Sequence, residues 1–207
     1  IFILFHKIII ILHDIKLRNR LKELSDKHRE IADIILFGST IRGKEKPSDI
    51  DILILFADKI DKDIEYAIRK AFETYYKNVS IISKTNKTSL DKAFDARESI
   101  LFEGKSLITG DNLAGKYGFT SWGMFKYNFA GWNNLKKTKF YYALNGRGDK
   151  KGIVRLLNGI KLSDSVILIP LDNIENFREF LELWKLDHRY IPILIPERLS
   201  RKKILGK

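Results

Sequence analysis

The sequence predicts an α/β (α+β) protein, in which a mixed sheet flanked by helices is followed by a second, smaller and basic α+β domain. Three observations predict this organisation. Short apolar runs typical of strands alternate with amphipathic helical stretches in the first half of the chain. Glycines cluster near residue 115, and the excess of Lys and Arg lies mostly beyond them. We therefore expect a first domain over residues 1–108 and a second over residues 116–207.

Apolar spacing and turn residues predict the elements of the first domain. Apolar residues at helical spacing alternate with strand-like runs, and the run STIRGKEKPS between the first two strands is a polar loop. The expected order is helix 14–31, strand 31–38, strand 49–56, helix 60–75 capped by Asp58 or Asp61, strand 79–83, and a last helix that Ser89 begins and Gly104 ends.

The second domain has a different texture. Residues 116–161 contain ten basic residues and one acidic residue, interleaved with ten aromatic residues. The aromatic residues recur near helical spacing, so they form either a core or a platform on which bases stack. A strand over residues 165–170, a helix over 172–184 with a capping box of Asp172 and Glu175, and a strand over 190–196 should follow.

Composition limits the chemistry that is available. With 44% hydrophobic and 12% aromatic residues, the 207-residue chain should fold rather than remain disordered. It has no cysteine, which excludes disulfide scaffolds, thiolate zinc sites and cysteine nucleophiles, and its four histidines lack the spacing of a metal pair. Any catalysis must therefore use carboxylates, hydroxyls or a hard cation.

The formal net charge of +12 favours a polyanionic partner such as a nucleotide or nucleic acid. Residues 106–207 hold 18 basic and 9 acidic side chains, so the excess belongs to the second half. A Lys- and Ile-rich composition can instead reflect a thermophilic or AT-rich source.

The first twelve residues, IFILFHKIIIIL, are apolar but too short to span a bilayer, and Lys7 interrupts them. We expect them to be a β-rich leader that packs on the protein, and we expect a cytoplasmic protein without a membrane partner.

The strongest chemical signal lies in the segment ILFGSTIRGKEKPSDIDILIL. A strand leads to Gly38 and Ser39, nine residues follow, and Asp49 and Asp51 open the next strand. Side chains at i and i+2 of a strand point to the same side, so both carboxylates should face one point. Two adjacent carboxylates repel each other unless a cation lies between them, and hard oxygen ligands suit magnesium.

The same segment carries groups that suit a phosphate chain. Gly38 allows the backbone to approach a phosphate closely, and Ser39 adds a hydroxyl donor. Arg42, Lys44 and Lys46 follow in the loop, where they could neutralise a triphosphate.

This pattern resembles the signature of the nucleotidyltransferase superfamily, whose fold is shared with DNA polymerase beta. The two apolar residues before Gly38, the Gly-Ser pair, the spacer and the run Asp49-Ile50-Asp51 match the form found in small archaeal and bacterial members, the minimal nucleotidyltransferases. The resemblance covers residues 14–105.

The resemblance implies a reaction. A nucleoside monophosphate would pass from a nucleoside triphosphate such as ATP to an acceptor hydroxyl, with release of pyrophosphate. Asp49 and Asp51 would be catalytic and would hold two magnesium ions. The triphosphate would bind at Gly38, Ser39, Arg42 and Lys46.

One departure from the family pattern concerns the third carboxylate, which members of the family usually supply from the following strand. Here that strand is VSIIS, and Ser80 stands at the expected position. Four acids follow nearby and could substitute for it, although each also fits the exposed face of the next helix: Asp91, Asp95, Glu98 and Glu103.

The sequence allows two acceptors for the transfer, and it also allows a protein that catalyses no transfer. The basic second half favours an RNA end, such as that of a tRNA. Some minimal relatives instead modify a partner protein in toxin-antitoxin pairs. The absence of an evident third carboxylate also allows a non-catalytic nucleotide- or RNA-binding module. The basic, glycine-rich loop over residues 145–152 could contact phosphate, but it lacks the P-loop pattern, which favours a plain connection.

Overall fold

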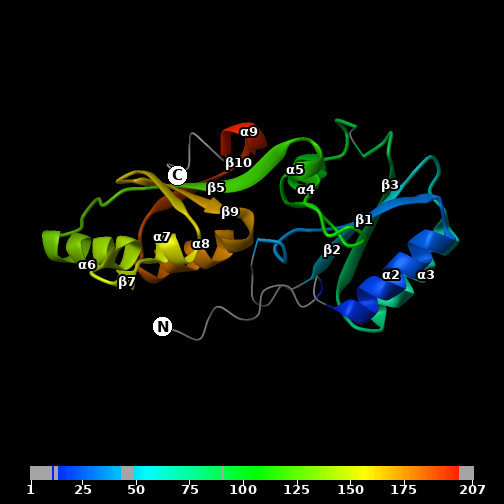
Figure 1. The fold of residues 1–207 in the computed structure, drawn as a ribbon, viewed down its shortest axis with the longest axis horizontal. Coiled ribbons are helices and arrows are strands. Elements are labelled where there is room, and N and C mark those ends of the chain that lie inside the picture. The colour runs from blue at the N-terminus through cyan, green and yellow to red at the C-terminus, as the bar shows by residue number, and fades with distance from the viewer. Residues whose placement is uncertain (1–10, 12–13, 43–48, 90, 201–207) are drawn as a thin grey trace. The chain divides into compact units, whose positions relative to one another are not determined.

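A computed structural model describes residues 11, 14–42, 49–89 and 91–200 (Figure 1). The chain divides into two compact units, Ile1–Tyr117 and Gly118–Lys207. Of the leader expected over residues 1–12, all but Ile11 lies outside the described residues. Within the described part of the chain, no helix has the length and apolar character needed to cross a membrane.

The first unit contains a mixed four-stranded sheet. Strand β1 pairs with β2 and with β4 in antiparallel fashion, whereas β2 and β3 are parallel, so the order is β3-β2-β1-β4. The strands are β1 (Ile31–Phe37), β2 (Ile50–Phe56), β3 (Val79–Thr85) and β4 (Lys105–Ser106). This confirms the mixed sheet expected from the sequence.

Two helices lie side by side in Figure 1 and contact each other, α2 (Ile15–Lys27) and α3 (Lys62–Glu73). Both begin at an aspartate whose carboxylate accepts hydrogen bonds from first-turn N–H groups, Asp14 for α2 and Asp61 for α3. Helix α3 forms the crossover that the parallel pair β2–β3 requires.

Helix α4 (Arg97–Glu103) is shorter than the sequence predicts, and the expectation that Ser89 begins it is wrong. The hydroxyl of Thr88 accepts the backbone N–H of Thr85, and the Ser89 N–H donates to the Thr85 carbonyl. Hydroxyl residues of this kind compete with helical backbone bonding, so the segment forms turns. The helix does end at Gly104, as expected.

Residues of β1, β2, α4 and the segment before α4 form a distinct core on one side of the sheet. It comprises Ile35, Phe37, Leu53, Phe94 and Ile100. Alternate residues of a strand point to opposite faces, so the neighbouring residues of β1 and β2 face the other side, where α2 and α3 contribute their apolar residues. Both strands are therefore buried on both sides, which explains their nearly continuous apolar sequence.

The second unit is built on an antiparallel sheet of order β10-β5-β9-β8. Its strands are β5 (Phe119–Tyr127), β8 (Ile160–Ser163), β9 (Val166–Pro170) and β10 (His188–Pro196). A two-stranded hairpin adds β6 (Gly146–Arg147) and β7 (Lys150–Lys151). The helical elements of the second unit are α6 (Asn134–Asn145), α7 (Ile153–Leu156), the 3-10 turn η1 (Leu171–Asn173), α8 (Ile174–Leu183) and α9 (Glu197–Ser200). The short helix α5 (Leu113–Lys116) precedes them, at the end of the first unit.

Most aromatic residues of the second unit form a core. Phe140 is fully buried and contacts the rings of Tyr127, Phe129, Trp132, Phe180 and Trp184, with centroids 5.4–5.7 Å apart. These rings are therefore not a stacking platform. Tyr141 and Tyr142, next to Phe140 in α6, are exposed.

The capping box predicted for α8 is wrong. Helix α8 begins at Ile174 and has no side-chain cap, because η1 precedes it and the Ile174 N–H donates to the Leu171 carbonyl. The Asn173 amide, at the cap position, donates instead to the Leu157 carbonyl.

Candidate active site

Gly38 and Asp51 are packed against each other at one end of the β1–β2 pair. Gly38 directly follows β1 with φ of +84°, and Asp51 pairs with Phe37 across the two strands. A Cβ atom on Gly38 would lie 2.4 Å from Asp51 Oδ2, closer than any real contact. The positive φ and this close approach both require glycine at this position.

Asp49 and Asp51 form a pair of neighbouring carboxylates. Asp49 immediately precedes β2 and is exposed, whereas Asp51 is half-buried on the side of the sheet that faces α4. Burial raises the pKa of Asp51 above its usual value, and the charges of Asp49 and Glu103 raise this pKa further, while Arg42 lowers it. A cation between Asp49 and Asp51 would relieve this repulsion.

The turn after β1 carries the residues expected to contact a triphosphate. The Ile41 N–H donates to the Gly38 carbonyl at 3.1 Å, which closes the turn, and the Ile41 side chain is fully buried beneath it. Ser39 is half-buried. The buried Oγ1 of Thr40 has no hydrogen-bond partner among the described residues. Lys46, also expected here, lies outside the described residues.

Glu103, at the end of α4, holds the turn in place. It is 4% exposed; its Oε1 accepts the Gly38 N–H at 2.9 Å and its Oε2 accepts Arg42 Nη1 at 2.5 Å. The expectation that Glu103 lies on an exposed helix face is therefore wrong, because both carboxylate oxygens bind the turn. Its position at the end of an apolar helical run, ILFEG, is the sequence signal for a buried role.

The other candidates for a third carboxylate are exposed. They are Asp91, Asp95 and Glu98, and Glu98 forms an ion pair with Arg97. Ser80 is the direct partner of Asp51 in the parallel pair β2–β3, so the two side chains share one face of the sheet. Ser80 thus places a hydroxyl where a third acid would lie.

The donor set fits a magnesium ion that is shared with a substrate. The described residues contain no group of three or more His, Asp or Glu side chains that could hold a metal by themselves. Magnesium is usually bound by one or two carboxylates together with substrate phosphates, and Asp49 and Asp51 supply such a pair. The unpartnered Thr40 hydroxyl in the same turn is a further unused polar group.

Residues 19–112 match the family model described as polymerase beta, nucleotidyltransferase. No curated protein matches the chain significantly.

Three solved structures are similar to about half of the chain. A tri-AMPylated Shewanella oneidensis HEPN toxin in complex with MNT antitoxin is 22% identical over 49% of this chain and 76% of that chain, with a TM-score of 0.33. A mutant of the toxin-antitoxin MntA-HpeT is 21% identical over 48% of this chain and 78% of that chain, with a TM-score of 0.35. A toxin-antitoxin with AMP-PNP is 23% identical over the same shares, with a TM-score of 0.35.

Proposed function

We propose, from the match of residues 19–112 to the polymerase beta nucleotidyltransferase family model, that the protein transfers a nucleoside monophosphate from a triphosphate such as ATP to an acceptor hydroxyl. The observation that carries the proposal is the contact of the Asp51 carboxylate with Gly38, in a turn that also holds Ser39 and Arg42. Paired carboxylates beside a tight turn suit in-line displacement at phosphorus.

In this proposal Asp49 and Asp51 bind two magnesium ions, with the Ser80 hydroxyl as a weaker donor on the same face. When bound, the ions neutralise charge on the triphosphate and lower the pKa of the attacking hydroxyl. Asp51 must be deprotonated to act as a ligand, although its pKa is raised. Without a cation nearby, the negative charge on the Asp51 carboxylate is unfavourable, and a bound cation would stabilise the deprotonated form.

The turn residues orient the phosphates. The Gly38 N–H is used by Glu103, so Gly38 contributes close approach rather than a donor. The half-buried Ser39 lies next to it in the turn and supplies a hydroxyl donor for a phosphate oxygen. Arg42, fixed by Glu103, places positive charge near Asp51 and near the triphosphate.

We propose RNA as the acceptor because the basic excess lies in the second half of the chain, where residues 106–207 include 18 basic and 9 acidic side chains. A partner protein and a non-catalytic module are the outcomes that would replace it.

The test is incubation of the full chain with magnesium, total RNA, soluble cell proteins and each nucleoside triphosphate labelled at its α-phosphate. Asp51→Asn is the inactive variant, and Asp58→Asn, an exposed aspartate beyond the other end of β2, is the matched control. Label that enters RNA with the wild type and the control but not with Asp51→Asn supports the proposal. Label that enters a protein would mean that the acceptor is a protein and not RNA. Nucleotide binding without any transfer would overturn the proposal that the protein is an enzyme.

A further inference from the structure

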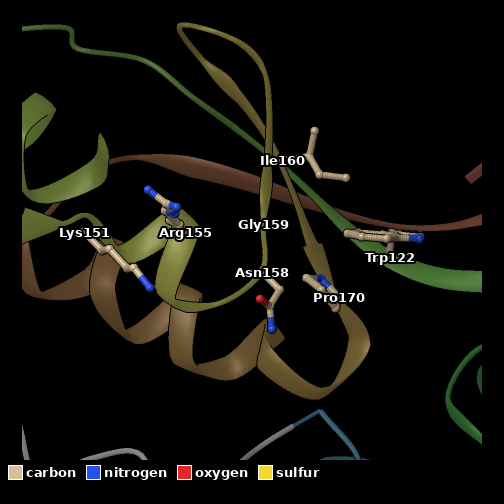
Figure 2. Close-up of a pocket in the computed structure, with 7 residues that line it drawn as sticks. All are labelled: Trp122, Lys151, Arg155, Asn158, Gly159, Ile160 and Pro170. Carbon is tan, nitrogen blue, oxygen red and sulfur yellow. The ribbon is translucent and has the colours of Figure 1, made fainter. Parts of the chain in front are cut away.

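The second unit contains a pocket of about 610 Å³ that the transfer reaction does not use (Figure 2). Its volume is in the range of pockets that hold small ligands. Three apolar side chains line one end, from Trp122, Ile160 and Pro170, and three polar ones line the rest, from Lys151, Arg155 and Asn158.

The apolar end has a fixed aromatic wall. Trp122 in β5 and Pro170 in β9 are direct cross-strand partners, so their rings are neighbours on one face of the sheet. The indole Nε1 donates to Thr120 Oγ1 at 3.0 Å, which orients the ring. Unlike the tryptophans in the aromatic core, Trp122 has no ring partner among the described aromatic residues. Its partly exposed face is available to stack on a planar group.

The opposite end carries two cations. Figure 2 shows Lys151 and Arg155 across the pocket from Trp122, with Asn158 between them and Pro170. Both cations are exposed, and neither side chain has an ion pair or hydrogen bond to another residue that the structure describes. Cations that line the side of the pocket opposite an aromatic wall suit a ligand with a negative group and a planar apolar group.

The basic surface continues beyond the pocket. A second hollow of about 340 Å³ shares Lys151 and Arg155 and extends over the β6–β7 hairpin, where it adds Arg147 and Lys150 together with one acid, Asp149, so four cations outnumber one carboxylate. The Arg147 guanidinium lies 4.9 Å from the Tyr142 ring centroid, which orients it. The hairpin is closely packed, since a Cβ on Gly152 would lie 2.3 Å from the Asn145 backbone.

We propose that this pocket binds one nucleotide of a single-stranded nucleic acid. The base stacks on Trp122, its phosphate contacts Lys151 and Arg155, and the adjoining phosphates follow Arg147 and Lys150 along the hairpin. Aromatic stacking combined with a basic track is the usual basis of single-strand binding. The continuation of cations past the pocket favours a strand over a free mononucleotide. The site stands on the second unit alone and does not depend on the transfer reaction.

The test is fluorescence anisotropy of the full chain with a labelled oligoadenylate, its deoxy counterpart, and AMP as competitor. Lys151→Ala with Arg155→Ala should weaken oligonucleotide binding about 10- to 30-fold near 0.1 M salt and make the log-log salt slope shallower by about 0.7, since the contact with one phosphate is lost. The matched control removes the same charge from exposed positions that line neither hollow, Lys126→Ala with Lys139→Ala, and should change affinity less than about threefold.

Trp122 is tested separately. Trp122→Leu keeps apolar volume but removes the aromatic face and should weaken binding about tenfold, whereas Trp122→Phe should retain most of the affinity. Equal losses in the two double variants, or no loss in Trp122→Leu, would overturn the proposal. AMP competing as strongly as the oligonucleotide would replace the strand by a mononucleotide.

Asp51→Asn separates this proposal from the proposed function. It should abolish transfer and leave oligonucleotide affinity unchanged. Transfer without pocket-dependent binding would refute only the pocket, and binding without transfer would refute only the enzyme.

Discussion

Replacing Glu103 by glutamine tests whether this buried carboxylate organises the candidate active site. The carboxylate accepts from both the Gly38 N–H and Arg42. Glutamine has one acceptor oxygen, so its NH₂ group must face one of these donors, and the ion pair between Arg42 and residue 103 is lost.

The magnitude follows from burial. Breaking a fully buried ion pair costs about 3–5 kcal/mol, but the Arg42 side chain is 28% exposed and water can solvate part of it. We therefore expect the first unit to lose about 2–3 kcal/mol of unfolding free energy. We also expect about a 100-fold loss in kcat/KM, because the turn no longer holds its position.

Amide exchange on peptides from β1 measures the stability of the first unit separately from the second. The matched control is Glu98→Gln in the same helix, an exposed residue paired only at the surface, which should cost less than about 0.5 kcal/mol. A second readout is the pKa of Asp51, which should fall when the charge of Glu103 is removed. Equal stability and equal activity in the two variants would refute the role of Glu103.

Four further predictions concern both units. Gly38→Ala should lower transfer at least ~100-fold, because its Cβ displaces Asp51, and should cost about 1–2 kcal/mol of stability; transfer assays and thermal unfolding measure the two effects. The raised pKa of Asp51 means that, without metal, its contribution to stability is full below its ordinary value of 3.8 and is lost as pH rises through the raised pKa. Magnesium should favour the deprotonated form of Asp51, so its binding near the raised pKa should release a proton from this carboxyl group. The heat of magnesium binding in titration calorimetry should then depend on the ionisation enthalpy of the buffer, and a binding heat that is the same in all buffers would contradict the prediction. Ser80→Asp should raise magnesium affinity about tenfold in titration calorimetry and raise the pKa of Asp51 further when metal is absent, since it adds a carboxylate in register with Asp51. Phe140→Ala should destabilise the second unit by about 3–5 kcal/mol in urea unfolding, whereas Tyr141→Ala should change it by less than about 1 kcal/mol; similar losses would show that the aromatic core is misassigned.

Local pattern was enough to predict much of the first unit. The alternation around Asp51 predicted a strand, and the Gly-Ser pair after an apolar run predicted the turn, because both depend on neighbours in sequence. The role of Glu103 could not be predicted in the same way. Its contacts to Gly38 and Arg42 join residues more than 60 positions apart, and no periodicity reports such a distance.

The errors have a similar origin. Helical spacing near Ser89 did not reveal that the hydroxyl of Thr88 would bond to the backbone of Thr85. In α6, spacing alone did not show that Phe140 is buried while Tyr141 is exposed, because aromatic residues occupy both faces of that helix. Tertiary contacts decided each case.

The bracing of the turn by Glu103 couples two parts of the first unit thermodynamically. A triphosphate that favours one arrangement of Gly38 and Arg42 also favours the placement of α4 that lets Glu103 reach them. Linkage is reciprocal. If a molecule binds α4, shifts it and thereby changes the affinity for the triphosphate by some factor, the triphosphate changes the affinity for that molecule by the same factor.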